Sequence, residues 1–305
     1  MVEVGDLLLA MYGATSGDIA ISKINGAINQ AILCIRTKHN KKFIESVWNK
    51  HVSHILMKYL QGGQGNLSAD IVKRISFSLP SLAEQERISH LMQLIDERIA
   101  TQSKVIDKLQ SLIKGIVDYT ILRKEQNATV GDVCSISEQI RAEANINDII
   151  TVRLHGNGVC KSSAENLQLG ATQYYRRKAG QLIYGKQNFH NGAIGIVPQS
   201  LDNGITSKDI PSFDIDEVKC NSVYLLAQLQ SPLYYKPAEA LTTGTSSKRL
   251  KEETFLKMPI VLPNKREQDN IAILIYRTLM NLDQAKRLLD LFSIQKQYLL
   301  RQMFI

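Results

Sequence analysis

Two stretches of the chain concentrate side chains that can hydrogen-bond to the edges of nucleic-acid bases. Lysine, arginine, asparagine, glutamine, serine and threonine present donor and acceptor patterns that distinguish one base edge from another, and glycine lets a backbone approach a ligand closely. The candidate residues of the two stretches are Lys186, Gln187, Asn188, His190, Thr243, Thr245, Ser246, Ser247, Lys248 and Arg249. Each stretch reads equally well as a surface turn, so both interpretations stay open.

The N-terminal region contains a looser version of the same two loops. Its candidate residues are Tyr12, Thr15, Ser16, Gln64 and Asn66. A run of cations, Arg176, Arg177 and Lys178, joins Lys186, Lys248 and Arg249 as candidates for contacts to phosphate groups. Local clusters of this kind suit a contact made through one face, although a solvated surface explains each cluster as well.

No residue pattern indicates catalysis or a metal site. The four cysteines are scattered without a C-x-x-C spacing, which argues against a disulfide framework and a zinc ribbon. His51 and His54 form a close pair, but no third ligand is placed to complete a metal site. Since the chain also has no phosphate-binding glycine loop, nucleophile elbow or H-E-x-x-H motif, we expect no catalytic residue, no metal and no cofactor.

The composition is that of a globular protein with a mild preference for polyanions. Hydrophobic residues make up 44% and charged residues 22% of the 305 positions, and 37 Lys plus Arg against 29 Asp plus Glu give a net charge of +8. Such a charge permits a nucleic-acid partner without requiring one. Because the sequence has neither a long apolar run nor a signal-peptide pattern at its start, we expect a cytoplasmic protein without a membrane partner.

The chain repeats itself at an offset of 183 positions. Leu79-Pro80 is followed by Glu84-Gln85 and Ile88, and Leu262-Pro263 is followed in the same way by Glu267-Gln268 and Ile271. Each copy opens a long segment whose apolar positions step by four and three, which is the heptad pattern of a coiled-coil helix. The seam residues are Ile88, Met92, Ile95, Ile99, Ile106, Leu109, Ile113, Ile116, Ile271, Ile275, Leu282, Leu289, Phe292 and Leu299.

These two helices flank a region with a different pattern. Residues 124–263 contain short β-like runs broken by Gly, Asn, Asp and Pro, which predicts a mixed α/β domain, and residues 1–82 repeat part of it. We therefore expect an α+β protein with two mixed α/β heads, at 1–82 and 124–263, joined by antiparallel helices at 83–123 and 264–305 that form a coiled-coil spacer. The start of the second head has no counterpart in the first, so the first head is expected to be truncated at its N-terminus.

The order of these motifs resembles the specificity subunits of type I restriction-modification systems. The resemblance rests on the two Leu-Pro-x-x-x-Glu-Gln-x-x-Ile helix starts, on Gly-x-Leu-[Leu/Ile] strands at Gly5 and Gly180, and on the run from Phe189 to Val197. It implies two target-recognition domains that each read half of a split sequence in double-stranded DNA, with the helices setting the gap. It also implies a non-catalytic subunit.

The family's assembly supplies the expected partners. The resemblance implies that the chain binds two methyltransferase subunits, which use S-adenosylmethionine, and restriction subunits, which are motor nucleases that use ATP and Mg²⁺. Those cofactors are expected on the partners only. Two alternatives remain: a structural coiled-coil adaptor whose heads bind protein rather than DNA, and a self-contained restriction-modification enzyme, which the missing catalytic motifs disfavour.

Overall fold

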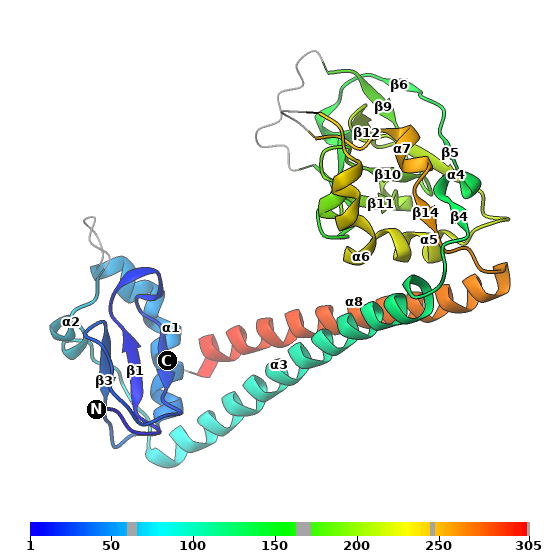
Figure 1. Ribbon diagram of the computed structural model, residues 1–305. Helices are drawn as coiled ribbons and strands as arrows, with labels where there is room; N and C mark the ends of the chain where they lie inside the picture. The colour runs from blue at the N-terminus through cyan, green and yellow to red at the C-terminus, as the bar shows by residue number, and fades with distance from the viewer. Residues whose placement is uncertain (60–65, 163–171, 245–247, 304–305) are drawn as a thin grey trace. The chain divides into compact units, whose positions relative to one another are not determined.

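The computed structural model describes residues 1–59, 66–162, 172–244 and 248–303. It divides into unit 1, residues 1–107 with 284–305, and unit 2, residues 108–283. Both units mix helices and strands, as the sequence predicted (Figure 1). Four candidate residues, Gln64, Thr245, Ser246 and Ser247, lie outside the described residues.

Unit 1 contains a small head built on a three-stranded antiparallel sheet. The strands run in the order β2-β1-β3, and the helices α1 and α2 follow them in the chain. Apolar side chains of α1, among them Trp48, form one core with Leu9 of β1 and Leu67. The bounds are β1 Leu7–Ala10, β2 Ile19–Ile21, β3 Ile32–Ile35, α1 Lys41–Tyr59 and α2 Ala69–Lys73.

Unit 2 contains a larger head with a four-stranded antiparallel sheet in the order β11-β10-β13-β5. A second sheet has the order β12-β9-β6, and β7 pairs with β8, while β14 pairs with β4. The strands are β4 Ala128–Thr129, β5 Cys134–Ile136, β6 Arg141–Ala142, β7 Ile150–Val152, β8 Val159–Lys161, β9 Tyr174–Arg176, β10 Leu182–Tyr184, β11 Ile194–Ile196, β12 Ile205–Ser207, β13 Ser212–Ile215 and β14 Pro259–Ile260. The helices are α4 Val130–Val133, α5 Ser222–Leu229, α6 Pro232–Tyr235 and α7 Glu252–Leu256.

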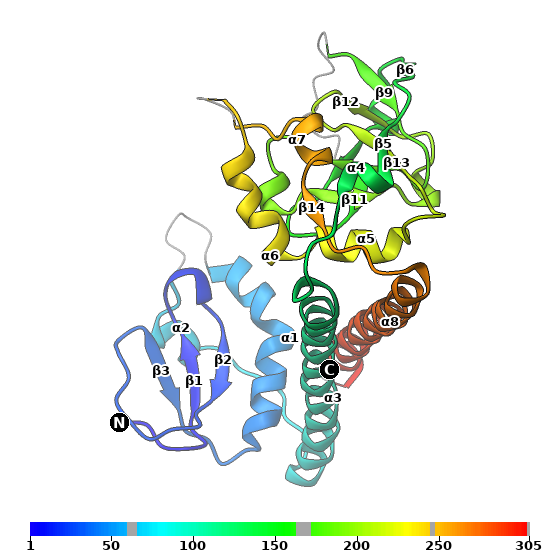
Figure 2. The ribbon, with the colours of Figure 1, turned by 45° about the vertical axis from the view of Figure 1, so that its right-hand side comes forward.

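The two heads share one frame. In unit 1, Leu7 of β1 pairs with Ile21 of β2, and in unit 2, Leu182 of β10 pairs with Ile196 of β11. The central strand then pairs on its other side with β3 in unit 1 and with β13 in unit 2. Each head ends in a long helix, so the repeat seen in the sequence is also a repeat of topology (Figure 2).

A glycine closes the turn after the central strand in both heads. Gly17 and Gly192 have φ angles of +94° and +75°, in the left-handed region that favours glycine. A Cβ atom at Gly17 would lie 2.8 Å from the Val52 side chain, and one at Gly192 would lie 2.9 Å from the Tyr235 ring. The turn that carries the first candidate loop therefore needs glycine in each head.

The core of the larger head is aromatic. The rings of Tyr184, Phe213 and Phe255 pack together with centroid distances of 4.6 to 5.7 Å, and Phe189 joins them edge-on against Tyr184 at 5.4 Å. All four side chains are fully buried. Phe189 thus anchors the loop 186–191 in the core, while Gln187 and Asn188 of the same loop are exposed.

The two long helices are α3, Leu82–Val117, and α8, Lys265–Met303, and α3 continues into a π-helical turn over Asp118–Leu122. Every apolar seam position predicted above is buried or half-buried. In unit 1, Gln102 donates to the carbonyl oxygen of Ala285 over 3.0 Å, and further along Asp96 pairs with Lys296 over 2.6 Å. The helices therefore run antiparallel there. None of the helices in the described ranges is long and apolar enough to cross a membrane.

Two positions of the four-and-three spacing on α8, Thr278 and Lys296, carry polar rather than apolar residues, and each has a specific partner. The Thr278 hydroxyl donates to the carbonyl oxygen of Leu274 over 2.8 Å, which satisfies a polar group that is only 5% exposed. Lys296 meets the Asp96 carboxylate, and Lys42 of α1 meets the same carboxylate over 2.7 Å. These two cations hold the pKa of Asp96 below its usual value, against the effect of burial.

The seam predicts unequal effects for two isoleucines on α8. Ile275→Ala removes a side chain that is 1% exposed, so we expect the free energy of unfolding to fall by about 2–5 kcal/mol. Ile273→Ala, at a position that is 51% exposed, is the matched control and is expected to cost less than about 0.5 kcal/mol. Urea unfolding followed by circular dichroism measures both, and equal losses contradict the assigned seam.

Candidate nucleic-acid interface

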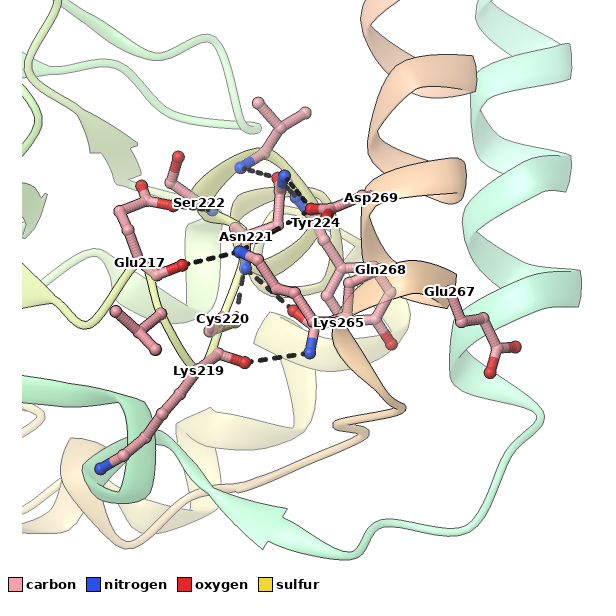
Figure 3. A network of polar contacts seen from close by, with 12 residues as sticks. Glu217, Lys219, Cys220, Asn221, Ser222, Tyr224, Lys265, Glu267, Gln268 and Asp269 are labelled. Carbon is pink, nitrogen blue, oxygen red and sulfur yellow. Dashed lines mark hydrogen bonds and ion pairs between the residues drawn. The ribbon is translucent and has the colours of Figure 1, made fainter.

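A buried glutamine joins the larger head to the start of α8 (Figure 3). Gln268 is 1% exposed, and its side-chain oxygen accepts from the backbone N–H of Asn221 over 2.9 Å. Its side-chain nitrogen donates to the carbonyl oxygens of Pro263 and Lys219 over 2.8 and 3.1 Å. Asn221 in turn caps α5, because its side-chain oxygen accepts from two N–H groups of the first turn.

The smaller head is joined to α3 in the same way. Gln85 is fully buried, its oxygen accepts from the N–H of Asn40 over 3.2 Å and its nitrogen donates to the carbonyl oxygen of Pro80 over 2.9 Å. Asn40 caps the first turn of α1 by accepting from the N–H of Phe43. The glutamine of each Leu-Pro-x-x-x-Glu-Gln motif therefore fixes a head on its helix.

The sequence analysis missed the asparagines of these joints. Asn40 and Asn221 are separated from their glutamines by 45 and 47 positions, so no local pattern connects them. The sequence does offer one weaker signal for these asparagines: an asparagine precedes a helix at the corresponding place of both repeats. Asparagine is a typical N-cap residue, so only its occurrence in both repeats distinguishes it from an ordinary helix cap.

The structure brings the two candidate loops of each head together. In unit 2, the N–H of Leu250, next to Arg249, donates to the carbonyl oxygen of Lys186 over 2.9 Å, and in unit 1, the N–H of Leu67, next to Asn66, donates to that of Met11 over 2.9 Å. The two donors are equivalent in the repeat, and so are the two acceptors, which lie just after the central strands. In each head, the described end of the second loop thus lies beside the start of the first loop.

The cations of the paired loops in unit 2 meet carboxylates. Lys186 lies 2.7 Å from Glu252 and is largely covered. Lys248 lies 3.1 Å from Glu239, and Arg249 lies 3.2 Å from Asp209; about half of each side chain in these two pairs is exposed. Exposed ion pairs contribute little to stability, so these two cations can exchange a carboxylate for a phosphate at small cost.

Arg177 corrects one expectation of the sequence analysis. This candidate phosphate contact is fully buried, and its guanidinium donates to the Thr206 and Ser212 hydroxyls over 2.8 and 2.9 Å and to the carbonyl oxygen of Ile210 over 3.0 Å. Burial lowers the pKa of this guanidinium to about 10. Its donors are used inside the head, so it does not reach DNA in this fold. The strand period explains the error: Arg176 and Lys178 point outward and Arg177 points inward.

The remaining candidates divide into exposed and partly covered residues. Gln187, Asn188, Arg176, Lys178, Thr243, Tyr12, Thr15 and Asn66 are exposed. The Ser16 hydroxyl donates to the carbonyl oxygen of Met11 over 3.0 Å and so supports its own turn. His190 is half-buried, and its Nδ1 atom is buried without a hydrogen-bond partner among the described atoms.

The described ranges contain no cluster of metal ligands, and two of the four cysteines are buried. No group of three or more His, Cys, Asp or Glu side chains in those ranges is placed to hold a metal ion. Burial raises the pKa of the Cys134 and Cys220 thiols to about 12. Both thiols therefore stay protonated at neutral pH and pack as apolar groups.

The repeated frame and the long helices define a protein with two similar heads, each followed by a long helix. Residues 2–111 match the protein family described as the type I restriction modification DNA specificity domain. A specificity subunit of the type I restriction enzyme MjaVIII from Methanocaldococcus jannaschii is 20% identical over 322 aligned residues, which cover 94% of this chain and 75% of that protein. The chain is thus a relative of the type I specificity subunits, and the resemblance read from its sequence is confirmed.

Solved structures support the fold. The S subunit of a type I restriction-modification system from M. genitalium superposes with a TM-score of 0.66 at 12% identity, covering 99% of this chain and 83% of that one. A chain from a study of complex assembly and conformational transition in the type I R-M system gives a TM-score of 0.56 at 12% identity, covering 99% and 82%. Heads joined by long helices are therefore the architecture of this chain.

The joint between head and helix predicts the effect of removing one glutamine. Gln268→Ala leaves the Asn221 N–H and two carbonyl oxygens without their partner, so we expect the melting temperature to fall, by an amount that corresponds to about 1–3 kcal/mol of unfolding free energy. Differential scanning calorimetry measures the change. Gln284→Ala, at an exposed position of the same helix, is the control, and a loss no larger than that of the control contradicts the joint.

Proposed function

We propose that this chain is a DNA-recognition subunit that reads a bipartite double-stranded target, one half with each head. The observation that carries the proposal is the pair of adjoining polar loops, joined by equivalent hydrogen bonds in both heads. Two loops side by side can follow a groove, where hydrogen bonds to base edges supply specificity and the flanking cations contact phosphates. The match of residues 2–111 to a DNA specificity domain supports the same function.

The helix pair is proposed to act as the ruler between the half-sites. With 36 residues in α3 and 39 in α8, the helices are roughly 54 and 58 Å long at about 1.5 Å per residue. That is longer than one turn of B-DNA, about 34 Å. Such a length supports two heads that contact DNA segments more than one helical turn apart.

We further propose that the outer faces of the helices bind the partner subunits. Away from the seam, α8 exposes large apolar side chains, with Ile273, Met280, Leu291, Ile294 and Tyr298 between 45% and 62% exposed. Exposed apolar side chains that gather on a surface are typical of a protein–protein contact. Its proposed partners are two methyltransferase subunits, with restriction subunits joining the assembly, and S-adenosylmethionine, ATP and Mg²⁺ bind to those partners. The chain itself is proposed to be non-catalytic.

Selection of bound sequences from random DNA, using the chain together with its methyltransferase partner, tests the function. The proposal expects two short conserved half-sites separated by a gap of constant length. A single contiguous site contradicts the proposal that each head reads a separate half-site. No enrichment at all favours the alternative of an adaptor whose heads bind protein.

The loop cations predict a change in salt dependence. Replacing Lys248 and Arg249 with alanine removes two candidate phosphate contacts, so we expect weaker binding to all sequences and a slope of log K against log salt that is shallower by about 1–2. Fluorescence anisotropy over a salt series measures this slope. The double variant Lys108→Ala and Lys286→Ala, at exposed positions on the helices, removes the same charge elsewhere and is expected to keep it. An unchanged slope for the loop variant rejects the phosphate contacts.

The ruler predicts a change in the gap between the half-sites. Inserting seven residues after Gln102 in α3 and after Ala285 in α8, which face each other, keeps the seam in register. The insertion adds about 10 Å to each helix, so we expect a gap that is about three base pairs longer. Insertion in α3 alone breaks the match between the seams and is expected to abolish bipartite binding. A gap of unchanged length in the double insertion contradicts the ruler.

A further inference from the structure

In unit 2, a tight turn leads from β12 into β13, the strand that pairs with the central strand β10. The N–H of Ile210 donates to the carbonyl oxygen of Ser207 over 3.1 Å, which closes a β-turn. The Ser207 hydroxyl also accepts from the N–H of Asp209 over 3.3 Å, as serine does in many turns. Residues 207–210, the third turn of unit 2 beside its two candidate loops, therefore carry Lys208 at their tip.

Unit 1 contains the same turn before β3, the strand that pairs with the central strand β1. The N–H of Ile32 donates to the carbonyl oxygen of Asn29 over 3.2 Å, and the Asn29 side-chain oxygen accepts from the N–H of Ala31 over 2.9 Å. Gln30 lies at the tip of this third turn of unit 1, residues 29–32. The turns of the two units have only their final isoleucine in common, so the repeat in the sequence did not reveal them.

In each head, one residue joins the third turn to the candidate loops. In unit 2, the N–H of Lys186 donates to the carbonyl oxygen of Asp209 over 2.9 Å, and in unit 1, the N–H of Met11 donates to that of Ala31 over 2.8 Å. Lys186 and Met11 are also the residues whose carbonyl oxygens accept from the second loop. The backbone of a single residue thus joins three chain segments just after the central strand of each head.

Side chains hold the third turn of unit 2 from two sides. The Asp209 carboxylate lies 3.2 Å from the guanidinium of Arg249 in the second loop. From inside the head, the buried Arg177 donates to the carbonyl oxygen of Ile210 over 3.0 Å, and the Thr206 hydroxyl donates to the same oxygen over 3.0 Å. A turn held in this way presents its tip in one orientation, which a contact to DNA requires.

The tips of the third turns are exposed and carry side chains suited to DNA. Both Gln30 and Lys208 are exposed. Within the described ranges, Lys208 forms no ion pair, whereas the loop cations Lys186, Lys248 and Arg249 meet carboxylates. A glutamine amide can pair with the edge of an adenine, and a lysine can contact a phosphate group.

We propose that the third turns belong to the DNA interface, so that each head contacts its half-site through three chain segments. Gln30 hydrogen-bonds to a base edge in the half-site of the smaller head, and Lys208 contacts a phosphate group in the half-site of the larger head. The inference rests on the proposed function in DNA recognition. It adds to that function two contact residues that the sequence patterns did not indicate.

Gln30→Ala tests the smaller head, in the chain bound to its methyltransferase partner. Selection of bound sequences from random DNA is expected to show a preference at one base pair that falls by about tenfold, as for the loss of one paired base edge. The other half-site is expected to keep its preference and is the internal control. Asn49→Ala, which removes an exposed amide of α1 outside the three segments, is the matched variant and is expected to change neither half-site.

Lys208→Ala tests the larger head through its salt dependence. Loss of one phosphate contact is expected to weaken binding to all sequences and to make the slope of log K against log salt shallower by about 1. Fluorescence anisotropy on the selected DNA measures this slope. Lys257→Ala removes an exposed cation of the same head outside the three segments, and it is expected to keep the slope of the wild type.

Either of two results overturns the proposal: an unchanged base preference in Gln30→Ala, or an unchanged salt slope in Lys208→Ala. An equal effect in the matched variant Asn49→Ala or Lys257→Ala also overturns it. A wild-type chain that selects no DNA sequence overturns the proposed function and the role of the third turns together. Selection of two half-sites by the wild type that the variants leave unaltered overturns the third turns alone, so the two failures are distinguishable.

Discussion

The structure depends on one buried side-chain amide in each joint between head and helix. An amide carries both a donor and an acceptor, and here the acceptor takes the N–H of a helix-capping asparagine while the donor reaches the carbonyl oxygen of the proline before the helix. Leaving these backbone groups buried and unpaired is costly. The amide therefore fixes the first turn of the long helix against the first turn of the helix in the head. Because the head is held in this way, the orientation of the loops after its central strand is set as well.

The helices were predictable because their signal is long. A heptad pattern over many turns survives single departures from apolar residues, and the structure accounts for two of them: Thr278 satisfies its hydroxyl on its own helix, and Lys296 meets Asp96. The two-headed organisation was predictable for a similar reason, since a repeat of whole motifs outweighs the ambiguity of each motif alone. The ends of the described helices lie within one or two residues of the predicted ranges, although the last turn of the first helix, Asp118–Leu122, is π-helical, which the heptad pattern did not indicate.

The functional surface was only partly predictable. A basic run predicted three phosphate contacts at 176–178, but the strand turns the middle one, Arg177, into the core, where hydroxyl and carbonyl groups meet its guanidinium. Likewise, the two loops of each head were identified separately, whereas their contact depends on a hydrogen bond across 64 positions, from Leu250 to Lys186. Whether the loop residues contact DNA stays a prediction. A hydrogen bond between residues so far apart in the chain produces no periodic pattern in the sequence, so the contact between the loops could not be predicted from it.

The duplicated joint has a consequence for how such proteins diversify. Its hydrogen bonds use one asparagine, one glutamine and otherwise mostly backbone groups, and both repeats present these groups in the same arrangement. A head with unrelated loops would therefore form the same joint with either helix, provided that the asparagine before the head's helix and the glutamine after the proline are kept. The loops can then vary while the contacts beneath them stay the same.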